Sequence, residues 1–288
     1  MKILFLAQHK WPHVGGVEKH IGEVSKWLRF SSAIKVKGGR VTIISSEDIK
    51  YPKIKYLGLL YIWYWLWKNR DIIKRSDLVH IHDVFIWYLP FRFIYPSKKV
   101  FTTFHGWEGI WPIPWKNILQ KRIAAKLSAG TIAVGKYIEK YYGIKANHIV
   151  YGGTSIIRMA EVKKIRNSVV FLGRLEKDTG VLKFLKRLDD FKYRNVTFVG
   201  DGPLRKMCEK YGKVIGFTDP VPYLKKAEYC IPAGYLSYIE AKQFGCKILV
   251  FPNNPLKKDY WSEIEKNKTF PTWTDIANEY LTLYKIKT

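Results

Sequence analysis

Short apolar runs alternate with segments of helical periodicity along nearly the whole chain. After the first run, residues 2–7, the positions Val17, Ile21, Val24 and Leu28 recur at the spacing of one helix face. Apolar strands that alternate with amphipathic helices are typical of parallel sheets covered by helices on both faces. The pattern therefore predicts an α/β protein.

The predicted strands fall into two series. The first comprises residues 2–7, 40–46, 77–82, 99–106, 129–135 and 148–153, and the second comprises residues 168–175, 195–202, 213–217, 227–233 and 246–251. Polar and basic residues replace the strand signal over residues 151–167, between the two series. We therefore expect two Rossmann-like domains, residues 1–152 and 153–274, each built on a parallel sheet.

The last segment, residues 275–288, predicts a helix. Its apolar positions share one face: Ile276, Tyr280, Leu281 and Tyr284. A face of this kind needs a partner to pack against, so we expect the helix to be buried along one side.

Charge narrows the possible partners. The 288 residues include 50 Lys and Arg against 24 Asp and Glu, which gives a net charge of +26. Such a surface attracts phosphate-rich partners: nucleic acid, anionic lipid headgroups or a phosphorylated small molecule. Nucleic acid is the least favoured, because the lysines are spread along the chain and no zinc finger, RRM signature or single basic arm is present.

The cysteines and the N-terminal residues indicate in which cellular compartment we expect the protein. Cys208, Cys230 and Cys246 show no CxxC spacing, and two of them fall in apolar strand-like runs, where buried thiols are expected. The N-terminal apolar run lacks a small-residue cleavage site, so it reads as a first strand and no signal peptide is expected. We expect a protein of a reducing, cytoplasmic compartment.

Two aromatic runs, residues 56–67 and residues 85–95, are the most apolar parts of the first domain. The first run has 12 residues, too few for the roughly 20 that a membrane-spanning helix needs. Its tryptophans and tyrosines with basic residues on both flanks are typical of a segment at a membrane surface. A buried helix packed against a sheet is the alternative, and the two can hold together.

In doubly wound sheets, ligands bind beyond the carboxyl ends of the strands, and for two facing domains this means an interdomain cleft. Glycines at a helix start can offer amides to a diphosphate or a sugar hydroxyl, although such pairs are more often plain turns. A guanidinium can bind a diphosphate bidentately. The candidate residues at or after the carboxyl ends of the predicted strands are Gly15, Gly16, His82, His105, Gly152, Gly153, Arg174, Gly200, Gly202 and Glu240.

Six motifs follow one another along the chain: residues 15–21 (GGVEKHI), 77–83 (DLVHIHD), 102–109 (TTFHGWEG), 171–180 (FLGRLEKDTG), 198–206 (FVGDGPLRK) and 238–251 (YIEAKQFGCKILVF). In this order they resemble the retaining nucleotide-sugar glycosyltransferases of family 4, which have the GT-B fold. The resemblance implies transfer of a hexose from a UDP- or GDP-linked sugar with retention of configuration. It implies no cofactor and no metal, and no HExxH or His/Cys cluster is present.

The resemblance also implies roles for single residues. His105 matches the family's active-site histidine, and Arg174 matches the arginine on the donor diphosphate. Gly202 lies in the loop near the nucleotide base, and Gly15 and Gly16 lie where the first helix meets the donor. The second domain then binds the donor, the first faces the acceptor, and the final helix crosses back to the first domain.

The sequence departs from the family pattern at two places. The lysine expected five residues after Arg174 is replaced by Thr179, so either Lys177, the nearest lysine, reaches the phosphates from a shifted loop or one of the two positive charges is missing. Of two glutamates expected with seven residues between them, Glu240 matches the second, which holds the ribose, and the first has no counterpart. We expect backbone amides to substitute for it, at Gly234, Tyr235, Leu236 and Ser237.

The acceptor is expected to be lipid-linked or a glycan. Aromatic residues beside lysines favour a peripheral enzyme on the anionic inner face of the cell membrane. The residues assigned to the acceptor side are His82, Trp107, Glu108 and Trp111. A non-catalytic protein of the same fold, which binds sugar nucleotide or membrane without turnover, is the main alternative, and a basic nucleic-acid-binding protein is the weaker one.

Overall fold

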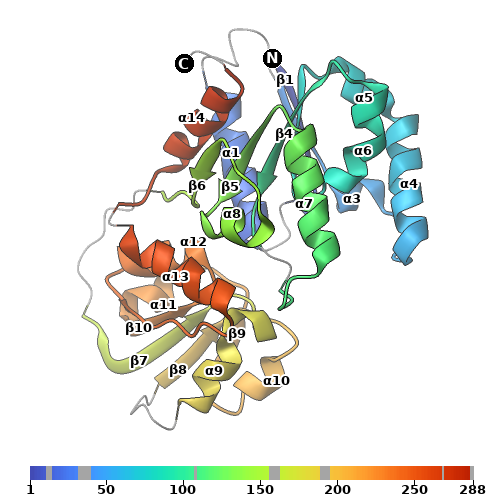
Figure 1. Ribbon diagram of the computed structural model, residues 1–288. Coiled ribbons are helices and arrows are strands. Elements are labelled where there is room, and N and C mark those ends of the chain that lie inside the picture. The colour runs from blue at the N-terminus through green and yellow to red at the C-terminus, as the bar shows by residue number, and fades with distance from the viewer. Residues whose placement is uncertain are drawn as a thin grey trace. The chain divides into compact units, whose positions relative to one another are not determined.

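The computed structural model describes residues 1–10, 15–31, 40–106, 109–155, 163–188, 195–267 and 269–285. The chain divides into two compact units (Figure 1). Unit 1 comprises Met1–Glu108, Pro112–Tyr151 and Trp273–Thr288, and unit 2 comprises Gly109–Trp111 and Gly152–Thr272. Each unit is built on one parallel sheet.

The sheet of unit 1 has six strands in the order β2-β1-β3-β4-β5-β6. All neighbours in it are parallel. The strands are β1 (Lys2–Ala7), β2 (Arg40–Ile44), β3 (Leu78–His82), β4 (Lys99–Phe104), β5 (Gly130–Val134) and β6 (His148–Val150). Every strand of the first predicted series is confirmed, because side chains on both faces of the central strands are buried.

Helices cover this sheet on both faces. They are α1 (Gly16–Phe30), α3 (Ser46–Ile49), α4 (Lys55–Lys68), α5 (Arg70–Arg75), α6 (Phe85–Ile94), α7 (Trp115–Leu127), α8 (Tyr137–Tyr142) and α14 (Trp273–Leu283). In α1, Ile21, Val24 and Leu28 are buried, as their spacing predicts.

Helix α14, at the end of the chain, belongs to unit 1 and packs beside α1 (Figure 1). The predicted apolar face is confirmed, since Ile276, Tyr280, Leu281 and Tyr284 are all buried. The helix is also joined to β6 by a hydrogen bond of 2.7 Å between His148 Nδ1 and a Glu279 carboxylate oxygen. Residues far apart in the sequence therefore share one core.

The sheet of unit 2 has five parallel strands in the order β11-β10-β7-β8-β9. The strands are β7 (Ile165–Leu172), β8 (Asn195–Val199), β9 (Lys213–Gly216), β10 (Ala227–Pro232) and β11 (Lys247–Ile248). The helices are the 3-10 turn η1 (Lys177–Thr179), α9 (Val181–Lys186), α10 (Arg205–Cys208), α11 (Val221–Lys226), α12 (Tyr235–Gln243) and α13 (Pro255–Lys266). The second predicted strand series is confirmed as well.

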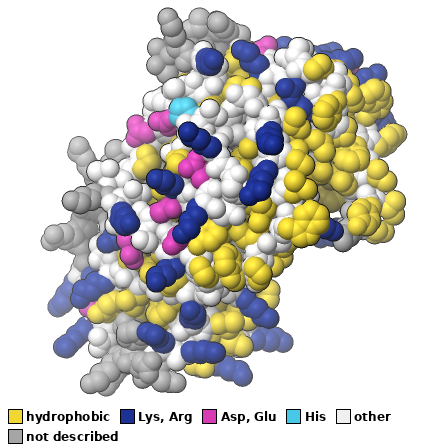
Figure 2. All heavy atoms as spheres, in the orientation of Figure 1, with side chains coloured by type: hydrophobic (Ala, Val, Ile, Leu, Met, Phe, Trp, Pro, Cys, Tyr) yellow, Lys and Arg dark blue, Asp and Glu magenta, His cyan; other side chains and the backbone are white. Residues whose placement is uncertain are grey.

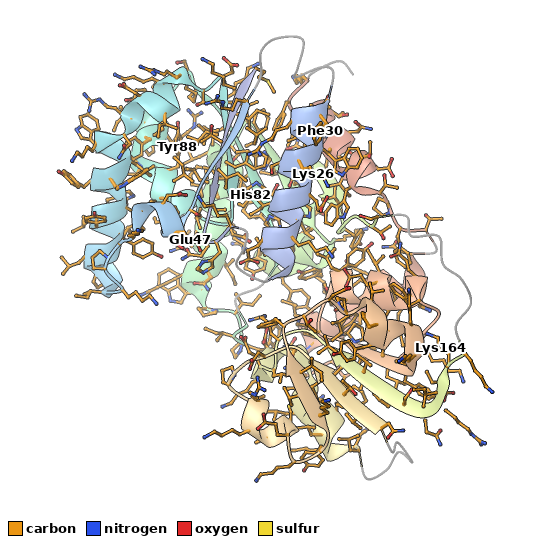
Figure 3. All side chains as sticks on the ribbon, turned by 180° about the vertical axis from the view of Figure 1, so that it is seen from behind. Lys26, Phe30, Glu47, His82, Tyr88 and Lys164 are labelled. Atoms are coloured by element: carbon orange, nitrogen blue, oxygen red, sulfur yellow. The ribbon has the colours of Figure 1, made fainter. Side chains whose placement is uncertain are left out.

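Unit 2 has a core on each face of its sheet. Phe171, Phe184 and Phe198 pack together on one face, while Cys230 and Cys246 lie on the other. All three cysteines are buried as free thiols, and burial raises their pKa. Lys164, labelled in Figure 3, donates to the carbonyl oxygens of Leu224 at 2.8 Å and Phe244 at 2.5 Å, beside the C-terminal ends of α11 and α12.

Within the described residues, no helix has both the length and the hydropathy that crossing a membrane requires.

Candidate functional site

Arg174 lies directly after β7, at the carboxyl end of the central strand of unit 2. Its guanidinium forms ion pairs with Glu176 and with Asp178, the second at 3.2 Å. About half of the arginine side chain stays exposed, at 48%. The two carboxylates hold the guanidinium in place while a face of it remains open to a ligand.

The loop after β8 packs directly on the loop that carries Arg174. The backbone N–H of Leu175 donates to the Asp201 carbonyl at 2.9 Å, and the N–H of Leu204 donates to the Leu175 carbonyl at 3.1 Å. A Cβ on Gly202 would lie 2.6 Å from the Leu175 carbonyl oxygen, so only glycine allows this approach. The Gly-Asp-Gly motif thus supports the Arg174 loop.

The N-terminus of α12 is next to Arg174, because β10 and β7 are neighbours in the sheet. A Cβ on Gly173 would lie 2.4 Å from the Cβ of Ala233. Gly234 is the N-cap of α12, and its N–H donates to the Ser237 hydroxyl at 3.1 Å. The amides of the first helical turn, residues 235–237, follow it at the carboxyl edge of the sheet.

Glu240 lies in the second turn of α12, which begins at Tyr235. Its side chain is half-buried, and it contributes to the field that raises the pKa of Cys230 on the adjacent strand. Sequence reasoning expected a backbone contribution from Gly234–Ser237 and a carboxylate at Glu240, and both lie on this one helix.

Lys177 and Thr179, the two candidates for the expected lysine position, lie in η1. Thr179 is buried and its hydroxyl donates to the Glu176 carbonyl at 2.8 Å. The side chain of Lys177 is exposed, and its carbonyl accepts from Asn253 Nδ2 at 2.9 Å. These two hydrogen bonds therefore stabilise the backbone of η1 itself.

Lys257, in the first turn of α13, is a residue of this region that sequence reasoning missed. Its ammonium interacts electrostatically with Asp178 and Arg174, and its Nζ lies 4.9 Å from the centre of the Tyr260 ring. The sequence does contain a signal for this residue. Asn254-Pro255 is a typical helix start and directly follows the last predicted strand, so the helix begins at the edge of the sheet where the carboxyl ends of the strands meet.

Unit 1 has a buried histidine cluster at the carboxyl ends of β3 and β4. Hydrogen bonds run from Tyr284 through His80, Thr103 and Tyr280 to His20, at 2.6, 2.7, 2.9 and 3.0 Å. The rings of His80 and His82 stack at 4.9 Å. Of these residues sequence reasoning selected only His82, although His20 stands in the GGVEKHI motif and the two tyrosines share the predicted face of the last helix.

His82, labelled in Figure 3, is hydrogen-bonded through Nδ1 to Nε2 of His105 at 2.8 Å. Its Nε2 is buried with no hydrogen-bond partner in the described part of the chain. A buried N–H without an acceptor is less favourable than a buried lone pair, so the arrangement favours His82 with its proton on Nδ1. His105 then accepts at Nε2 and carries its own proton on Nδ1.

His105 is also fixed by Asp83 and kept neutral. Asp83 accepts from the His105 backbone N–H at 3.0 Å and from Lys121 Nζ at 2.8 Å. Burial, with a smaller contribution from Lys121, lowers the pKa of His105 to about 3. At neutral pH the ring is therefore a neutral hydrogen-bonding group. Sequence reasoning missed both Asp83 and Lys121, of which only the first is adjacent to a selected residue.

The N-terminus of α1, at Gly15 and Gly16, holds a carboxylate of the same chain. A Cβ on Gly15 would lie 2.1 Å from Glu18 Oε2, so this side chain folds back over the helix start. Because the carboxylate already lies at the positive helix end, a second anion there would be repelled. The ring of His20, one turn further along, contacts that of His105 edge-on at 4.9 Å.

The residues assigned to the acceptor side are placed only in part. Trp107 and Glu108 lie outside the described residues. Trp111 is 40% exposed and belongs to unit 2, where a Cβ on the preceding Gly109 would lie 3.6 Å from Asp178 Oδ2. Among the described residues, no three His, Cys, Asp or Glu side chains are grouped so that they could hold a metal ion.

The first aromatic run forms α4, which is buried along one side, as the interpretation of a packed helix predicts. Ile62 and Leu66 are buried against the unit. The opposite side, which we name the α4 face, is a broad apolar area in Figure 2. Its exposed side chains are Ile54, Tyr56, Leu57, Leu60, Tyr61, Tyr64 and Trp67.

The comparisons with known proteins bear on the first half of the chain and on the fold. The model of Glycosyltransferase Family 4 matches residues 14–155. This part of the chain is a glycosyltransferase family 4 domain. No curated protein sequence matches the chain.

Solved structures resemble the whole chain, at low identity. S. aureus MnaA, in a co-structure with UDP, is 12% identical with a TM-score of 0.60, over 99% of this chain and 88% of that one. Anabaena HepE in complex with UDP is 17% identical with a TM-score of 0.58, over 99% and 97%. The UDP-GlcNAc 2-epimerase of Neisseria meningitidis, bound to UDP-GlcNAc, is 12% identical with a TM-score of 0.57, over 100% of both chains. The family 4 domain thus belongs to a chain with the GT-B fold.

Proposed function

We propose that the protein is a retaining glycosyltransferase that moves a hexose from a nucleoside diphosphate sugar to a lipid-linked or glycan acceptor at a membrane surface. One observation carries the proposal: in unit 2, Arg174 and the N-terminus of α12 lie on neighbouring strand ends. A guanidinium beside the amides of a helix start is suited to a diphosphate. UDP is the first nucleotide to test, because S. aureus MnaA and Anabaena HepE were both solved with it.

In this proposal α12 and the adjacent loops bind the donor. Arg174 and Lys177 face the diphosphate, the amides of Gly234–Ser237 hold the sugar or the second phosphate, and Glu240 accepts hydrogen bonds from the ribose hydroxyls. Gly202 keeps the loop near the base in contact with the Arg174 loop. Positive charge beside the diphosphate lowers the barrier, since negative charge grows on the leaving group as the glycosidic bond breaks.

The proposed reaction is a front-face displacement. The bond between the anomeric carbon and the diphosphate oxygen breaks, and the acceptor hydroxyl forms its bond on the same face of the sugar. The departing phosphate oxygen takes the hydroxyl proton, so atoms and charge balance without a metal or a nucleophilic side chain. The protein contributes positioning and charge stabilisation.

In the proposed reaction, unit 1 contributes groups that bind hydroxyls. His105, held by His82 and Asp83, offers an Nδ1–H to a hydroxyl oxygen. The Glu18 carboxylate at the start of α1 makes Gly15 and Gly16 better suited to a sugar hydroxyl than to a phosphate. His82, Trp107, Glu108 and Trp111 stay assigned to the acceptor side.

The α4 face supports an acceptor in a membrane. Its tyrosines, leucines and tryptophan lie beside exposed basic residues, among them Lys53, Lys68, Lys74 and Arg75. Amphipathic rings settle at the lipid headgroups, and each nearby cation adds about 1 kcal/mol on anionic lipid. We propose peripheral binding on the inner face of the cell membrane.

The test is a screen of UDP- and GDP-sugars with the purified full-length chain and lipid acceptors, with the product identified by mass. We expect one donor to be consumed, with the hexose added to an acceptor in the original anomeric configuration and with EDTA present. Thermal stabilisation by nucleotide without consumption of any donor would favour the non-catalytic alternative. Tight, salt-sensitive RNA binding without nucleotide binding would exclude the enzyme.

A further inference from the structure

At the diphosphate site proposed for unit 2, Thr179 stands where the family pattern has a lysine, and the nearest lysine along the chain, Lys177, is two positions early. Thr179 is buried and bonded within its own turn. A positive side chain from another element, close to Arg174, would replace the charge of that lysine.

Helix α13 begins beside the Arg174 loop and is tied to it by several contacts. Asn253 Nδ2 donates to the Lys177 carbonyl at 2.9 Å, and Lys183 Nζ donates to the Pro252 carbonyl at 2.6 Å. A Cβ on Gly180 would lie 2.4 Å from the Phe251 carbonyl oxygen. The segment before α13 is thus held against η1, and the first turn of the helix has a defined position.

Lys257 lies in that first turn. Its own backbone N–H donates to the Asn254 side chain at 2.8 Å, which caps the helix. Its Nζ stands 4.9 Å from the Tyr260 ring centre, and the Tyr260 hydroxyl is 3.8 Å from where a Cβ on Gly234 would lie. The first turn of α13 therefore lies beside the Arg174 loop, and Tyr260, in the second turn, lies close to the N-terminus of α12.

The electrostatics of this position favour an anion. Burial lowers the pKa of Lys257 to about 8, Asp178 acts in the opposite direction, and Arg174 adds to the fall. A half-buried ammonium beside a guanidinium is unfavourable by itself. A bound diphosphate would offset the cost of burying the ammonium and its repulsion from Arg174, and it would compete with Glu176 and Asp178 for the guanidinium.

We propose that Lys257, from α13, supplies a cation for the diphosphate of the donor at the site where the family's lysine after Arg174 is replaced by Thr179. The inference rests on the proposed function. Lys257 is identified by its position in the fold, because its spacing from Arg174 along the sequence does not indicate this role.

The experiment measures UDP affinity of the full chain by calorimetry for the wild type, Lys257→Ala, Lys257→Arg, Arg174→Ala and the control Lys258→Ala. Lys258 is the exposed neighbour on the same helix and loses the same charge. We expect Lys257→Ala to weaken UDP binding by about 10- to 100-fold, the effect of one charge-assisted hydrogen bond. Lys257→Arg should recover part of the loss, and Lys258→Ala should stay within about 2-fold.

Uridine provides the second readout, followed by ligand NMR with the same variants. Because it carries no phosphate, its affinity should be the same in the wild type and in Lys257→Ala, whereas a merely structural defect would weaken both ligands. Equal UDP affinity in Lys257→Ala and Lys258→Ala, with a loss in Arg174→Ala, would overturn the inference and leave the proposed function intact. A wild-type chain that binds neither UDP nor GDP would overturn both.

Discussion

The buried histidines of unit 1 are held in the neutral form by their surroundings. Burial is the largest cause that lowers the pKa of His20, His80, His82 and His105. Their partners are hydroxyls and one another, which suit neutral rings. The cluster is therefore a candidate site that acid destabilises, since protonation of any of these rings places a charge in a buried position, and at His105 that charge is also repelled by Lys121.

This arrangement predicts the pH dependence of stability. Below pH 6.5 the unfolded chain binds protons at these histidines and the folded protein does not, so the free energy of unfolding falls as the pH falls. The slope reaches about 1.4 kcal/mol per pH unit for each histidine. Urea unfolding at pH 7.5, 6.5 and 5.5 measures it. His20→Gln should reduce the slope by the contribution of one histidine, about 1.4 kcal/mol per pH unit. An unchanged slope would contradict the conclusion that His20 is held in the neutral form.

Glu240 provides a second test at a single side chain. If its carboxylate accepts from both ribose hydroxyls, Glu240→Ala should weaken UDP binding by about 10-fold or more. The matched measurement uses 2′,3′-dideoxy-UDP, whose affinity should not change because the hydroxyls are gone. The same loss for both ligands would mean that the side chain supports α12 and does not bind the ribose.

Glycines determine how closely the elements of unit 2 approach each other. The loop after β8 reaches the Arg174 loop only because Gly200 and Gly202 have positive φ angles of 156° and 154° and no side chain. A Cβ on Gly200 would lie 1.8 Å from the Gly173 carbonyl oxygen. Such contacts depend on backbone meeting backbone, so they cannot relax by rotation of a side chain.

Gly200→Ala should therefore lower the free energy of unfolding by about 3 kcal/mol or more, through backbone strain and overlap. Gly22 is the matched control, because it lies within α1 and a Cβ there would have nothing within 4 Å. Gly22→Ala should raise stability by about 0.5–1 kcal/mol, as alanine favours a helix over glycine. Chemical unfolding of both variants checks the signs, and similar destabilisation of the two would refute the argument.

The molecule as a whole combines a net charge of +26 with the exposed α4 face. Either feature alone has ordinary explanations. An anionic lipid surface makes use of both, since the charge attracts the protein and the aromatic and aliphatic side chains enter the headgroup layer.

We expect the full chain to sediment with vesicles that contain anionic lipid and to dissociate as the salt concentration rises. The double variant Leu60→Glu/Tyr64→Glu should weaken binding by about 10-fold or more, because each glutamate removes apolar area and adds repulsion. Phe30→Glu, on α1 at 61% exposure, is the control and should bind nearly as the wild type does. Equal loss in both would show that charge alone drives binding.

Much of the architecture follows from the sequence by itself. Short apolar runs such as residues 2–7 and 227–232, bounded by turn residues, favour buried strands, and the spacing of Ile276, Tyr280 and Leu281 favours one buried helix face. The motifs that follow the strands are enough to indicate the family. These are local properties, which the order of residues carries directly.

Which side chains meet was decided by the tertiary structure. Lys257 approaches Arg174 across 83 positions of sequence, and Tyr280 bonds to Thr103 across 177, as Tyr284 does to His80 across 204. Nothing in the periodicity of α13 or α14 specifies such partners, because a helix face defines only which residues are buried together. The sequence alone therefore determined the elements, the sheets and the family resemblance, while the cation beside the proposed diphosphate site and the histidine cluster exist only where separate elements pack.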